Sequence, residues 1–297
     1  MCPSASDAYA GEMPDILSAR LRAVAQQLAD AGVPDPLVDA ELLIGHVLGL
    51  GRGELQAAVV RGDGLEDADA ARLDALVARR AAREPLQHLT GVAAFRHLEL
   101  AVGPGVFVPR PETETVVQIA IDALMESASP APVAIDLGTG SGAIALAMAT
   151  EVPHARVFAV ERSPEAHAWA ARNTADAANL TLVLGDLATA FDELRGTASV
   201  VISNPPYVPD DAIPRDPEVR LHDPAQALYG GADGLDVVRV ISRRAQELLH
   251  PGGLLVLEHG ELQGASIRSL LEVDGWRAAA THEDLTRRDR ATTALSR

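Results

Sequence analysis

Lysine is absent from this 297-residue chain, and other residue types are scarce. Arginine therefore supplies all 25 basic residues, against 42 acidic ones, and the formal net charge is −17. With the high alanine content, the missing lysine is typical of GC-rich coding and carries no functional meaning. Aromatic residues make up only 3%, so the core must consist mainly of Leu, Val, Ile and Ala. The acidic balance argues against a broad grip on a nucleic-acid backbone, which needs basic surface, but leaves a local basic patch open.

Cysteine and long apolar segments are also lacking. The single cysteine, Cys2, excludes an intramolecular disulfide and a cysteine-based metal site, and no His, Asp or Glu set has metal-ligand spacing, so we expect no metal. No run of about 18 apolar residues predicts a membrane span, and the N-terminus lacks the pattern of a signal peptide. The 47% hydrophobic content is ordinary for globular proteins. We expect a cytoplasmic protein without a membrane partner, built from one large or two ordinary domains.

Helical periodicity dominates the N-terminal part. Apolar residues at positions 17, 21, 24 and 28 have the spacing of one helix face. Three further helices are predicted over residues 36–48, 54–60 and 67–83. In the first of these, Leu37, Leu43 and Val47 are predicted to face inward. Residues 14–84 thus predict an all-helical bundle, and we expect the small, polar residues 1–13 to be irregular.

The pattern changes at Glu84-Pro85. Short β-like pieces within residues 86–108, punctuated by glycine and proline, predict a β-hairpin connector over residues 85–111. Strands are predicted at 133–137, 156–160, 180–184, 198–203 and 253–258, with a final pair near 276–282 and 290–296. Helices are predicted at 112–125, 142–151, 164–176, 235–249 and 261–273. This alternation predicts an α/β domain over residues 112–297, with a doubly wound, mostly parallel, seven-stranded sheet.

A glycine loop, Asp136-Leu-Gly-Thr-Gly-Ser-Gly142, follows the first strand of this domain. Its glycines allow a tight turn and close ligand approach, and the helix behind it offers N–H groups. Glu161 ends the next strand, where a carboxylate can accept hydrogen bonds from both ribose hydroxyls. Two of the glycines and Ala143 also fit a dinucleotide fingerprint. Asp136, however, would repel phosphates, which favours S-adenosylmethionine over a dinucleotide.

The segment Gly185-Asp186-Leu187 follows the third strand. Taken alone it is an ordinary turn. In series with the glycine loop and the ribose acid, it fits a contact with adenine. Asp186 would accept a hydrogen bond from the amino group, and Leu187 would lie against the ring.

The most informative stretch is Asn204-Pro205-Pro206-Tyr207, directly after the fourth strand. The prolines end the strand and stiffen the backbone, which fixes Asn204 and the Pro205 carbonyl as acceptors and lets Tyr207 offer a flat face. Such a site suits a planar group with an NH₂, either an amide or a base amino group. Two acceptors orient the nitrogen lone pair toward a methyl donor. No dedicated base is required, because the proton can leave once the nitrogen is cationic.

These elements together resemble the HemK/PrmC family, the protein-(glutamine-N5) methyltransferases of peptide-chain release factors. Five segments carry the resemblance: FVPRPETE (107–114), DLGTGSG (136–142), SNPPYV (203–208), DPEVRLHDPAQALYGGADGLD (216–236) and LEHG (257–260). The resemblance implies a class I S-adenosylmethionine-dependent methyltransferase domain, which leaves S-adenosylhomocysteine as product. It also implies that the N-terminal bundle docks a release factor, whose Gly-Gly-Gln glutamine is methylated in support of translation termination.

The resemblance further implies the residues of the site. Cofactor-binding residues would be Asp136, Gly138, Thr139, Gly140, Ser141, Gly142, Glu161, Asp186, Leu187 and Asn204. Substrate-binding residues would be Phe107, Arg110, Asn204, Pro205, Pro206 and Tyr207, and the catalytic ones among them Asn204, Pro205 and Tyr207. Three positions depart from the pattern. Glu161 stands where Asp is also common, Leu187 stands where Trp is frequent, and the turn 284–290 lacks an expected glycine.

Other functions remain open. The tetrapeptide also fits a methyltransferase for a ribosomal-protein glutamine or for an exocyclic amino group of a nucleic-acid base, although the charge of −17 argues against stable nucleic-acid binding. An NAD-dependent oxidoreductase would use the glycine loop but leave the tetrapeptide without a role. A non-enzymatic binding module would not need the complete set.

Several residues outside the central motifs have two interpretations. Arg110 and Glu112 either shape the mouth of the substrate site or pair with each other and hold the hairpin. Trp169 and His259 are expected to be structural. The cluster of Arg79, Arg80 and Arg83 is expected to form a solvated face, with contact to a release factor or to RNA as the alternative.

Overall fold

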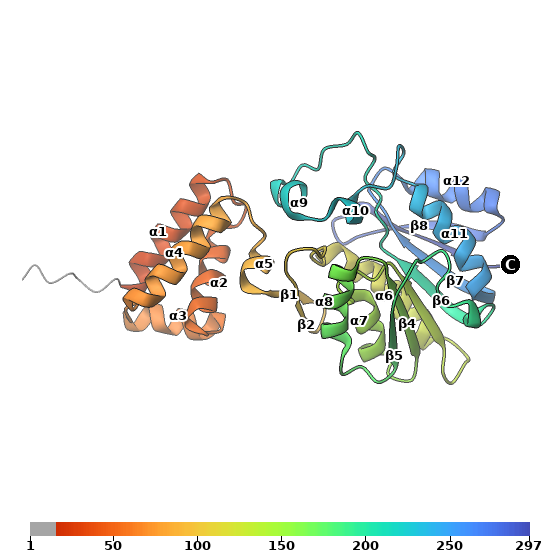
Figure 1. Cartoon of the computed structure of the whole chain (residues 1–297), viewed down its shortest axis with the longest axis horizontal. Helices are drawn as coiled ribbons and strands as arrows, with labels where there is room; N and C mark the ends of the chain where they lie inside the picture. The colour runs from red at the N-terminus through yellow and green to blue at the C-terminus, as the bar shows by residue number, and fades with distance from the viewer. Residues whose placement is uncertain (1–15) are drawn as a thin grey trace, which may run out of the picture. The chain divides into compact units, whose positions relative to one another are not determined.

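The computed structural model describes residues 16–297, whose helices and strands are drawn in Figure 1. The chain consists of two compact units, with the division between Thr90 and Gly91. This division falls inside the predicted connector of residues 85–111, so the three-part domain scheme stays a prediction. Cys2 and the predicted irregular stretch of residues 1–13 lie outside the described residues.

The first unit is helical. Its helices are α1 (Leu17–Asp30), α2 (Pro36–Leu48), α3 (Arg52–Arg61), α4 (Asp67–Ala81) and α5 (Leu86–Thr90). Their apolar faces share one core, to which Leu43 and Val47 contribute as predicted. The prediction for Leu37 was wrong: it is 53% exposed, since it lies on the outer side of α2. Residues 86–90 were predicted to be β-like but are helical, because the Pro85 carbonyl accepts the N–H groups of the third and fourth residues after it and closes a turn.

The arginine cluster at the end of α4 does not form one solvated face. Arg80 is 5% exposed, and its Nε donates to Asp39 Oδ2 on α2 at 2.6 Å. Arg79 lies at the surface in an ion pair, and Arg83 donates to the Gly32 carbonyl at 2.8 Å. Arg80 therefore ties α4 to α2 inside the bundle. The sequence could not reveal this, because the burial of Arg80 depends on which turn of α4 faces α2.

The second unit begins with the predicted hairpin, formed by β1 (Val92–Phe95) and β2 (Leu98–Ala101) in antiparallel register. Residues 106–109, predicted as a further β-like piece, form no strand. They lead into α6 (Pro111–Met125). Pro109 and Pro111 both lack the backbone N–H group that pairing in a sheet requires, which explains why no strand forms here.

A seven-stranded sheet forms the centre of the second unit. Its strands are β3 (Val133–Leu137), β4 (Arg156–Glu161), β5 (Leu180–Leu184), β6 (Ala198–Ser203), β7 (Leu249–Glu258), β8 (Arg277–Glu283) and β9 (Asp289–Leu295). The order is β5-β4-β3-β6-β7-β9-β8, parallel except for β9, which pairs antiparallel with both β7 and β8. The predicted doubly wound, mostly parallel fold is confirmed. The chain reverses its winding at β3, whose neighbours β4 and β6 lie on opposite sides.

Helices cover both faces of the sheet, as Figure 1 shows. The helices α6, α7 (Ala143–Glu151) and α8 (Pro164–Thr174) share one core, and α11 (Asp236–Leu248) and α12 (Gly264–Asp274) share the other. Successive strand residues point to opposite cores, so Ala134 packs with the first group and Ile135 with the second. The sequence missed η1 (Asp192–Leu194), α9 (Pro217–His222) and α10 (Ala225–Leu228), which are too short to show a period. No helix within residues 16–297 is long and apolar enough to cross a membrane.

Candidate active site

A cavity of about 530 Å³ opens at the carboxyl ends of the central strands. The loops after β3, β4, β5 and β6 line it, together with the start of α6 and the segment around α9 and α10. This is the switch point of the sheet, where ligands bind in open α/β folds. The predicted site residues that line the cavity are Phe107, Arg110, Gly138, Thr139, Gly140, Ser141, Glu161, Asp186, Leu187, Asn204, Pro205, Pro206 and Tyr207. Asp136 and Gly142 do not line it.

The glycine loop between β3 and α7 has a backbone that only glycine adopts readily. The φ angles are 80° at Gly138, 59° at Gly140 and 85° at Gly142, all in the left-handed region. Glu161 holds the loop, because its Oε2 accepts the N–H of Gly140 at 2.9 Å and its Oε1 accepts the N–H of Ser163 at 2.8 Å. Each carboxylate oxygen keeps a second lone pair, so Glu161 can also accept hydrogen bonds from hydroxyls of a ligand.

Asp136 lies beneath this loop and is fully buried. Its Oδ2 accepts a hydrogen bond from the Thr139 hydroxyl at 2.5 Å, and its Oδ1 has no partner among the residues described. Burial raises the pKa of Asp136 to about 7, against the opposing effect of the Thr139 hydrogen bond. In this geometry the carboxyl acts on the loop through Thr139, whereas the resemblance implies a direct contact with the ligand.

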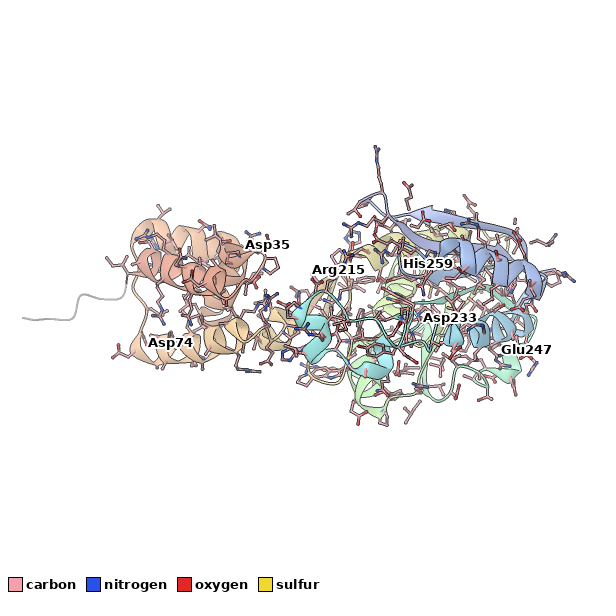
Figure 2. The ribbon with its side chains drawn as sticks, turned by 90° about the horizontal axis from the view of Figure 1, so that it is seen from above. Asp35, Asp74, Arg215, Asp233, Glu247 and His259 are labelled. Carbon is pink, nitrogen blue, oxygen red and sulfur yellow. The ribbon has the colours of Figure 1, made fainter. Side chains whose placement is uncertain are left out.

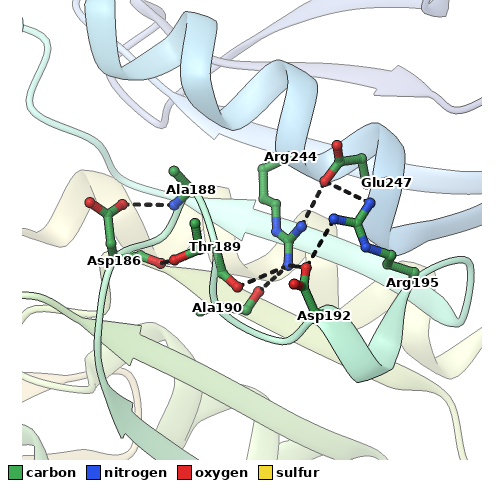
Figure 3. A network of polar contacts seen from close by, with 8 residues as sticks. All are labelled: Asp186, Ala188, Thr189, Ala190, Asp192, Arg195, Arg244 and Glu247. Carbon is green, nitrogen blue, oxygen red and sulfur yellow. Dashed lines mark hydrogen bonds and ion pairs between the residues drawn. The ribbon is translucent and has the colours of Figure 1, made fainter.

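The loop after β5 carries Asp186 and Leu187 along the cavity, and it is anchored from behind. Asp186 Oδ1 accepts the N–H two residues further on at 2.8 Å, which leaves Oδ2 able to accept from a ligand. Arg244, 3% exposed on α11, donates to the Ala190 carbonyl at 2.6 Å and pairs with Asp192 at 2.8 Å. Figure 3 shows this network, which fixes the loop after β5 to α11.

The tetrapeptide Asn204-Pro205-Pro206-Tyr207 starts where β6 ends. Ser203 is fully buried, and its hydroxyl donates to the Leu137 carbonyl at 2.5 Å, which fixes the end of β6 against β3. The prolines lack donors, so the backbone leaves the sheet at this point and lines the cavity. Burial raises the pKa of Tyr207 to about 12, which favours the neutral phenol.

The glycines of the segment Tyr229–Asp236 pack against the backbone of this tetrapeptide. The Gly230 N–H donates to the Val208 carbonyl at 2.9 Å. A Cβ at Gly230 would collide with the carbonyl oxygen of the second proline, and one at Gly234, where φ is 74°, with that of Tyr207. Glycine at these positions lets two backbones touch, which explains why this stretch accompanies the tetrapeptide.

Arg110 pairs with Asp223 and not with Glu112. Its Nη2 donates to Asp223 Oδ2 at 2.7 Å, and its guanidinium carbon lies 4.9 Å from the centre of the Phe107 ring. Burial raises the pKa of Asp223, and the charge of Arg110 opposes the shift. The pair connects the residues before α6 to the segment between α9 and α10, and Arg110 and Phe107 both line the cavity.

Three further cavity residues received no role from the sequence. Thr113 lies in the first turn of α6, Glu258 ends β7, and Arg290 lies in β9. Glu258 is 2% exposed, and burial raises its pKa to about 7. Its place at the carboxyl end of the strand beside β6 is the sequence signal that could have identified it.

His259 and Trp169 have structural partners, as expected. His259, labelled in Figure 2, is fully buried, with Nδ1 2.9 Å from the Gly260 carbonyl and Nε2 2.8 Å from the Thr292 hydroxyl. Burial lowers the pKa of His259, so the neutral ring is favoured. Trp169 packs against the first core and donates to the Pro104 carbonyl at 3.3 Å.

The turn 284–290 forms without glycine. Asp284 Oδ1 accepts the N–H of Thr286 at 2.8 Å and that of Arg288 at 3.2 Å. Arg287 takes the left-handed conformation that glycine would adopt, with φ 61°. Within residues 16–297, no group of three His, Cys, Asp or Glu side chains is placed to hold a metal ion.

The sheet order, the glycine loop and the Asn-Pro-Pro-Tyr segment at one edge define a methyltransferase. Residues 98–227 match the methyltransferase small domain, and residues 20–91 match the PrmC N-terminal domain. The release factor glutamine methyltransferase of Streptomyces coelicolor is 50% identical over 283 residues, covering 94% of this chain and 98% of the relative. That of Bifidobacterium longum is 44% identical over 283 residues, covering 91% and 96%. The chain belongs to the release factor glutamine methyltransferase family.

A relative with a different name also aligns over most of the chain. The 4-amino-L-phenylalanine/4-methylamino-L-phenylalanine methyltransferase of Streptomyces pristinaespiralis is 38% identical over 261 residues, covering 86% of this chain and 87% of the relative. The name of that relative describes an aromatic amine as methyl acceptor.

Proposed function

We propose that this protein transfers a methyl group from S-adenosylmethionine to the side-chain amide nitrogen of the glutamine in the Gly-Gly-Gln motif of peptide-chain release factors. One observation carries the proposal. A single cavity joins the glycine loop and Glu161 to the carbonyl and amide acceptors of Asn204-Pro205. Family membership over nearly the whole chain supports the same substrate.

The cavity suits S-adenosylmethionine in size and in the chemistry of its lining. Ligand cavities hold about 300–1,000 Å³, and this one measures about 530 Å³. In the proposed arrangement Glu161 accepts hydrogen bonds from the ribose hydroxyls, Asp186 accepts from the adenine amino group, and Leu187 lies against the adenine ring. Asp136 supports the glycine loop from below. When bound, the cofactor supplies an electrophilic methyl group on a positively charged sulfur.

The tetrapeptide is proposed to bind and activate the amide of the substrate glutamine. An amide nitrogen is a weak nucleophile, because its lone pair is delocalised into the carbonyl. Asn204 Oδ1 and the Pro205 carbonyl each accept one N–H of the glutamine amide, which fixes the nitrogen and raises its electron density. Tyr207 stays neutral and offers its ring to the flat amide. The new N–C bond would form as the bond between the sulfur and the methyl group breaks, with S-adenosylhomocysteine as the leaving group. Asn204 Oδ1 and the Pro205 carbonyl would disperse the positive charge that develops on the nitrogen, which then loses one N–H proton to solvent.

The bundle of residues 14–84 is proposed to dock the release factor, in a cytoplasmic protein. The match of residues 20–91 to the PrmC N-terminal domain supports an accessory role of this unit in the family. The net charge of −17 supports a protein substrate over stable binding to nucleic acid.

An aromatic amine is the second candidate acceptor. The 38%-identical relative named for 4-amino-L-phenylalanine favours it, because its planar NH₂ can also meet two carbonyl-type acceptors. The release factor remains the better candidate, since the relatives named for it are up to 50% identical.

Labelled S-adenosylmethionine tests the proposal directly. The protein is incubated with release factor, with release factor whose motif glutamine is replaced by glutamate, with RNA, with DNA and with 4-aminophenylalanine. Label is expected on the motif glutamine alone. Asn204→Ala should lower the rate by about 10² or more, as for the loss of one preorganised polar contact, while Gln246→Ala, an exposed amide distant from the cavity, should not.

Each alternative outcome has a definite meaning. Label on the aromatic amine alone supports the second candidate, and label on nucleic acid alone contradicts the proposal. Thermal melting separates the cofactors, because only a ligand that binds the folded state raises the melting temperature. Stabilisation by NAD and not by S-adenosylmethionine would overturn the cofactor assignment.

A further inference from the structure

Three sequence segments meet at one buried carboxyl group in the cavity. Glu258 ends β7, Thr113 lies in the first turn of α6, and Asn204 follows β6. Glu258 and Thr113 are 2% and 3% exposed. Glu258 Oε2 is buried without a hydrogen-bond partner among the described residues. A carboxylate in such a place is costly, so its presence beside the tetrapeptide calls for a function.

The polar contacts among these side chains have one consistent direction when Glu258 is ionised. Asn204 Nδ2 donates to Thr113 Oγ1 at 3.4 Å, and the side chains of Thr113 and Asn204 both lie close enough to the Glu258 carboxyl to lower its pKa. When Glu258 is ionised, the form that the Arg290 charge favours, its carboxylate only accepts, so the single hydroxyl proton of Thr113 points to Glu258. The Thr113 oxygen can then only accept from Asn204. The NH₂ end of the Asn204 side chain therefore faces Thr113 and Glu258.

This direction matters because an asparagine side chain has two nearly isosteric orientations. With its NH₂ end toward Thr113, Asn204 presents Oδ1 to the other side. With the reverse orientation it would present N–H donors to a substrate amide that itself offers N–H groups. The first orientation binds such a substrate, and the second repels it.

Charged and titratable groups surround Glu258 on several elements. The charge of Arg290, from β9, lowers the pKa of Glu258, and the charge of Glu112, from α6, raises it. Tyr207 lies close enough for the Glu258 charge to raise its pKa, and the adjacent His259 is neutral and held by its own partners. Arg290 also pairs with Asp284 at 3.2 Å, which fixes its guanidinium. The positive charge of Arg290 favours the ionised, accepting form of Glu258.

We infer that Thr113 and Glu258 are positioning residues, which hold the Asn204 side chain with Oδ1 toward the substrate amide. The inference rests on the proposed function, since it concerns the orientation of a group that touches the substrate. Neither residue is assigned a bond to the reacting nitrogen. Their effect on the reaction therefore has to pass through Asn204.

Glu258→Gln is the central variant, because it keeps the shape but can donate as well as accept, and so permits both orientations of Asn204. Thr113→Val removes the hydroxyl at similar volume. Glu261→Gln is the matched control: it makes the same chemical change in an exposed residue of the loop after β7, outside the cavity lining. Rates are measured in single turnovers with labelled S-adenosylmethionine and release factor, and cofactor affinity by calorimetry.

Glu258→Gln and Thr113→Val are each expected to lower the methyl-transfer rate about tenfold or more, with cofactor affinity within twofold of the parent. Glu261→Gln should behave as the parent. The decisive readout is a double-mutant cycle. In the Asn204→Ala background, Glu258→Gln should cause no further loss, because the side chain that it orients is gone.

Other outcomes overturn the inference. Multiplicative losses in the cycle would mean that Glu258 acts independently, for example as a proton acceptor. If Asn204→Ala is too slow for the cycle, an unchanged rate in Glu258→Gln, or a loss of rate and cofactor affinity together, contradicts positioning. The proposed function fails separately, when the parent protein itself does not label the motif glutamine.

Discussion

Gly234→Ala is predicted to lower the methyl-transfer activity, although Gly234 itself does not line the cavity. Gly234 has φ 74°, and a Cβ there would lie 2.8 Å from Gln263 Nε2, 3.0 Å from the Tyr207 carbonyl carbon and closer still to the carbonyl oxygen. Carbon atoms in contact lie about 3.5–4.0 Å apart, so the Tyr207 backbone has to move by about 0.5–1 Å. That carbonyl also accepts from Gln263 at 2.9 Å, so the movement breaks a hydrogen bond.

Gly196→Ala provides the matched control. Gly196 lies in the same unit with φ 69°, and a Cβ there would meet no atom within 4 Å. Both variants share the cost of about 1–2 kcal/mol for a side chain in the left-handed region. Gly234→Ala adds about 1–3 kcal/mol for overpacking. The difference between the two melting temperatures isolates the clash, at about 2–4 °C per kcal/mol for a unit of this size.

Activity provides the second measurement. A shift of about 1 Å in a group that positions substrate can lower the rate about 10²-fold, so Gly234→Ala should lose most of its methyl transfer to release factor. Gly196→Ala should keep it at temperatures below its melting transition. Equal stability and equal activity of the two variants would falsify the argument that the glycine segment sets the position of Tyr207.

Three further predictions follow from other parts of the structure. Arg80→Ala should destabilise the helical unit by about 3–5 kcal/mol, because it leaves Asp39 without its buried ion pair. Arg79→Ala, at an exposed position, should cost less than about 1 kcal/mol. Hydrogen exchange in that unit distinguishes the two variants, and equal protection of their amides would contradict the burial argument. Arg287→Gly should raise the free energy of unfolding by about 0.5–1 kcal/mol by relieving its φ of 61°, and a lower melting temperature would refute this. Burial raises the pKa of Asp136 to about 7, so the folded state binds this proton more tightly than the unfolded chain does. The stabilisation from Asp136 is complete below the ordinary carboxyl pKa and is lost as the pH rises to about 7. Asp136→Asn should therefore show a shallower fall in melting temperature over that pH range. An unchanged slope of melting temperature against pH would contradict the raised pKa of Asp136.

The pH argument for Asp136 also applies to Glu258 and Asp223, because burial raises the pKa of both carboxyl groups. The pKa of Glu258 is raised to about 7, so part of the slope remains in Asp136→Asn. The Glu258 contribution separates in Glu258→Gln, which removes that group. Either variant alone therefore tests the sign, and the two together test whether burial accounts for the slope.

Much of the second unit could be predicted from the chain. The strands at 133–137, 180–184 and 198–203 begin and end where the apolar runs predict. Local sequence determines such elements, because strands of a parallel sheet are short apolar runs bounded by glycine, proline or polar residues. The glycine loop and the tetrapeptide were also found, since each has a backbone conformation that only particular residues permit.

The contacts between distant segments could not be predicted. Arg110 pairs with a residue more than a hundred positions away, Asp223, and not with the nearby Glu112. Arg80 is buried although its neighbour Arg79 is exposed, because α2 covers only one side of α4. Leu37 is exposed for the same kind of reason. A periodic pattern indicates that a helix has an inner face, but only packing decides which side chains at its edges are covered.

The sequence by itself therefore determined the class of fold, the family resemblance and the motifs that line the cavity. The missing lysine and the single cysteine did not affect these predictions. Only the tertiary structure decided that Asp136 lies beneath the glycine loop, and that Thr113 and Glu258 meet Asn204. Local patterns determine backbone conformation, because that conformation depends on neighbouring residues. Side-chain partnership depends on which strand ends and helix starts share one edge of the sheet, and it is set only when the whole unit has folded.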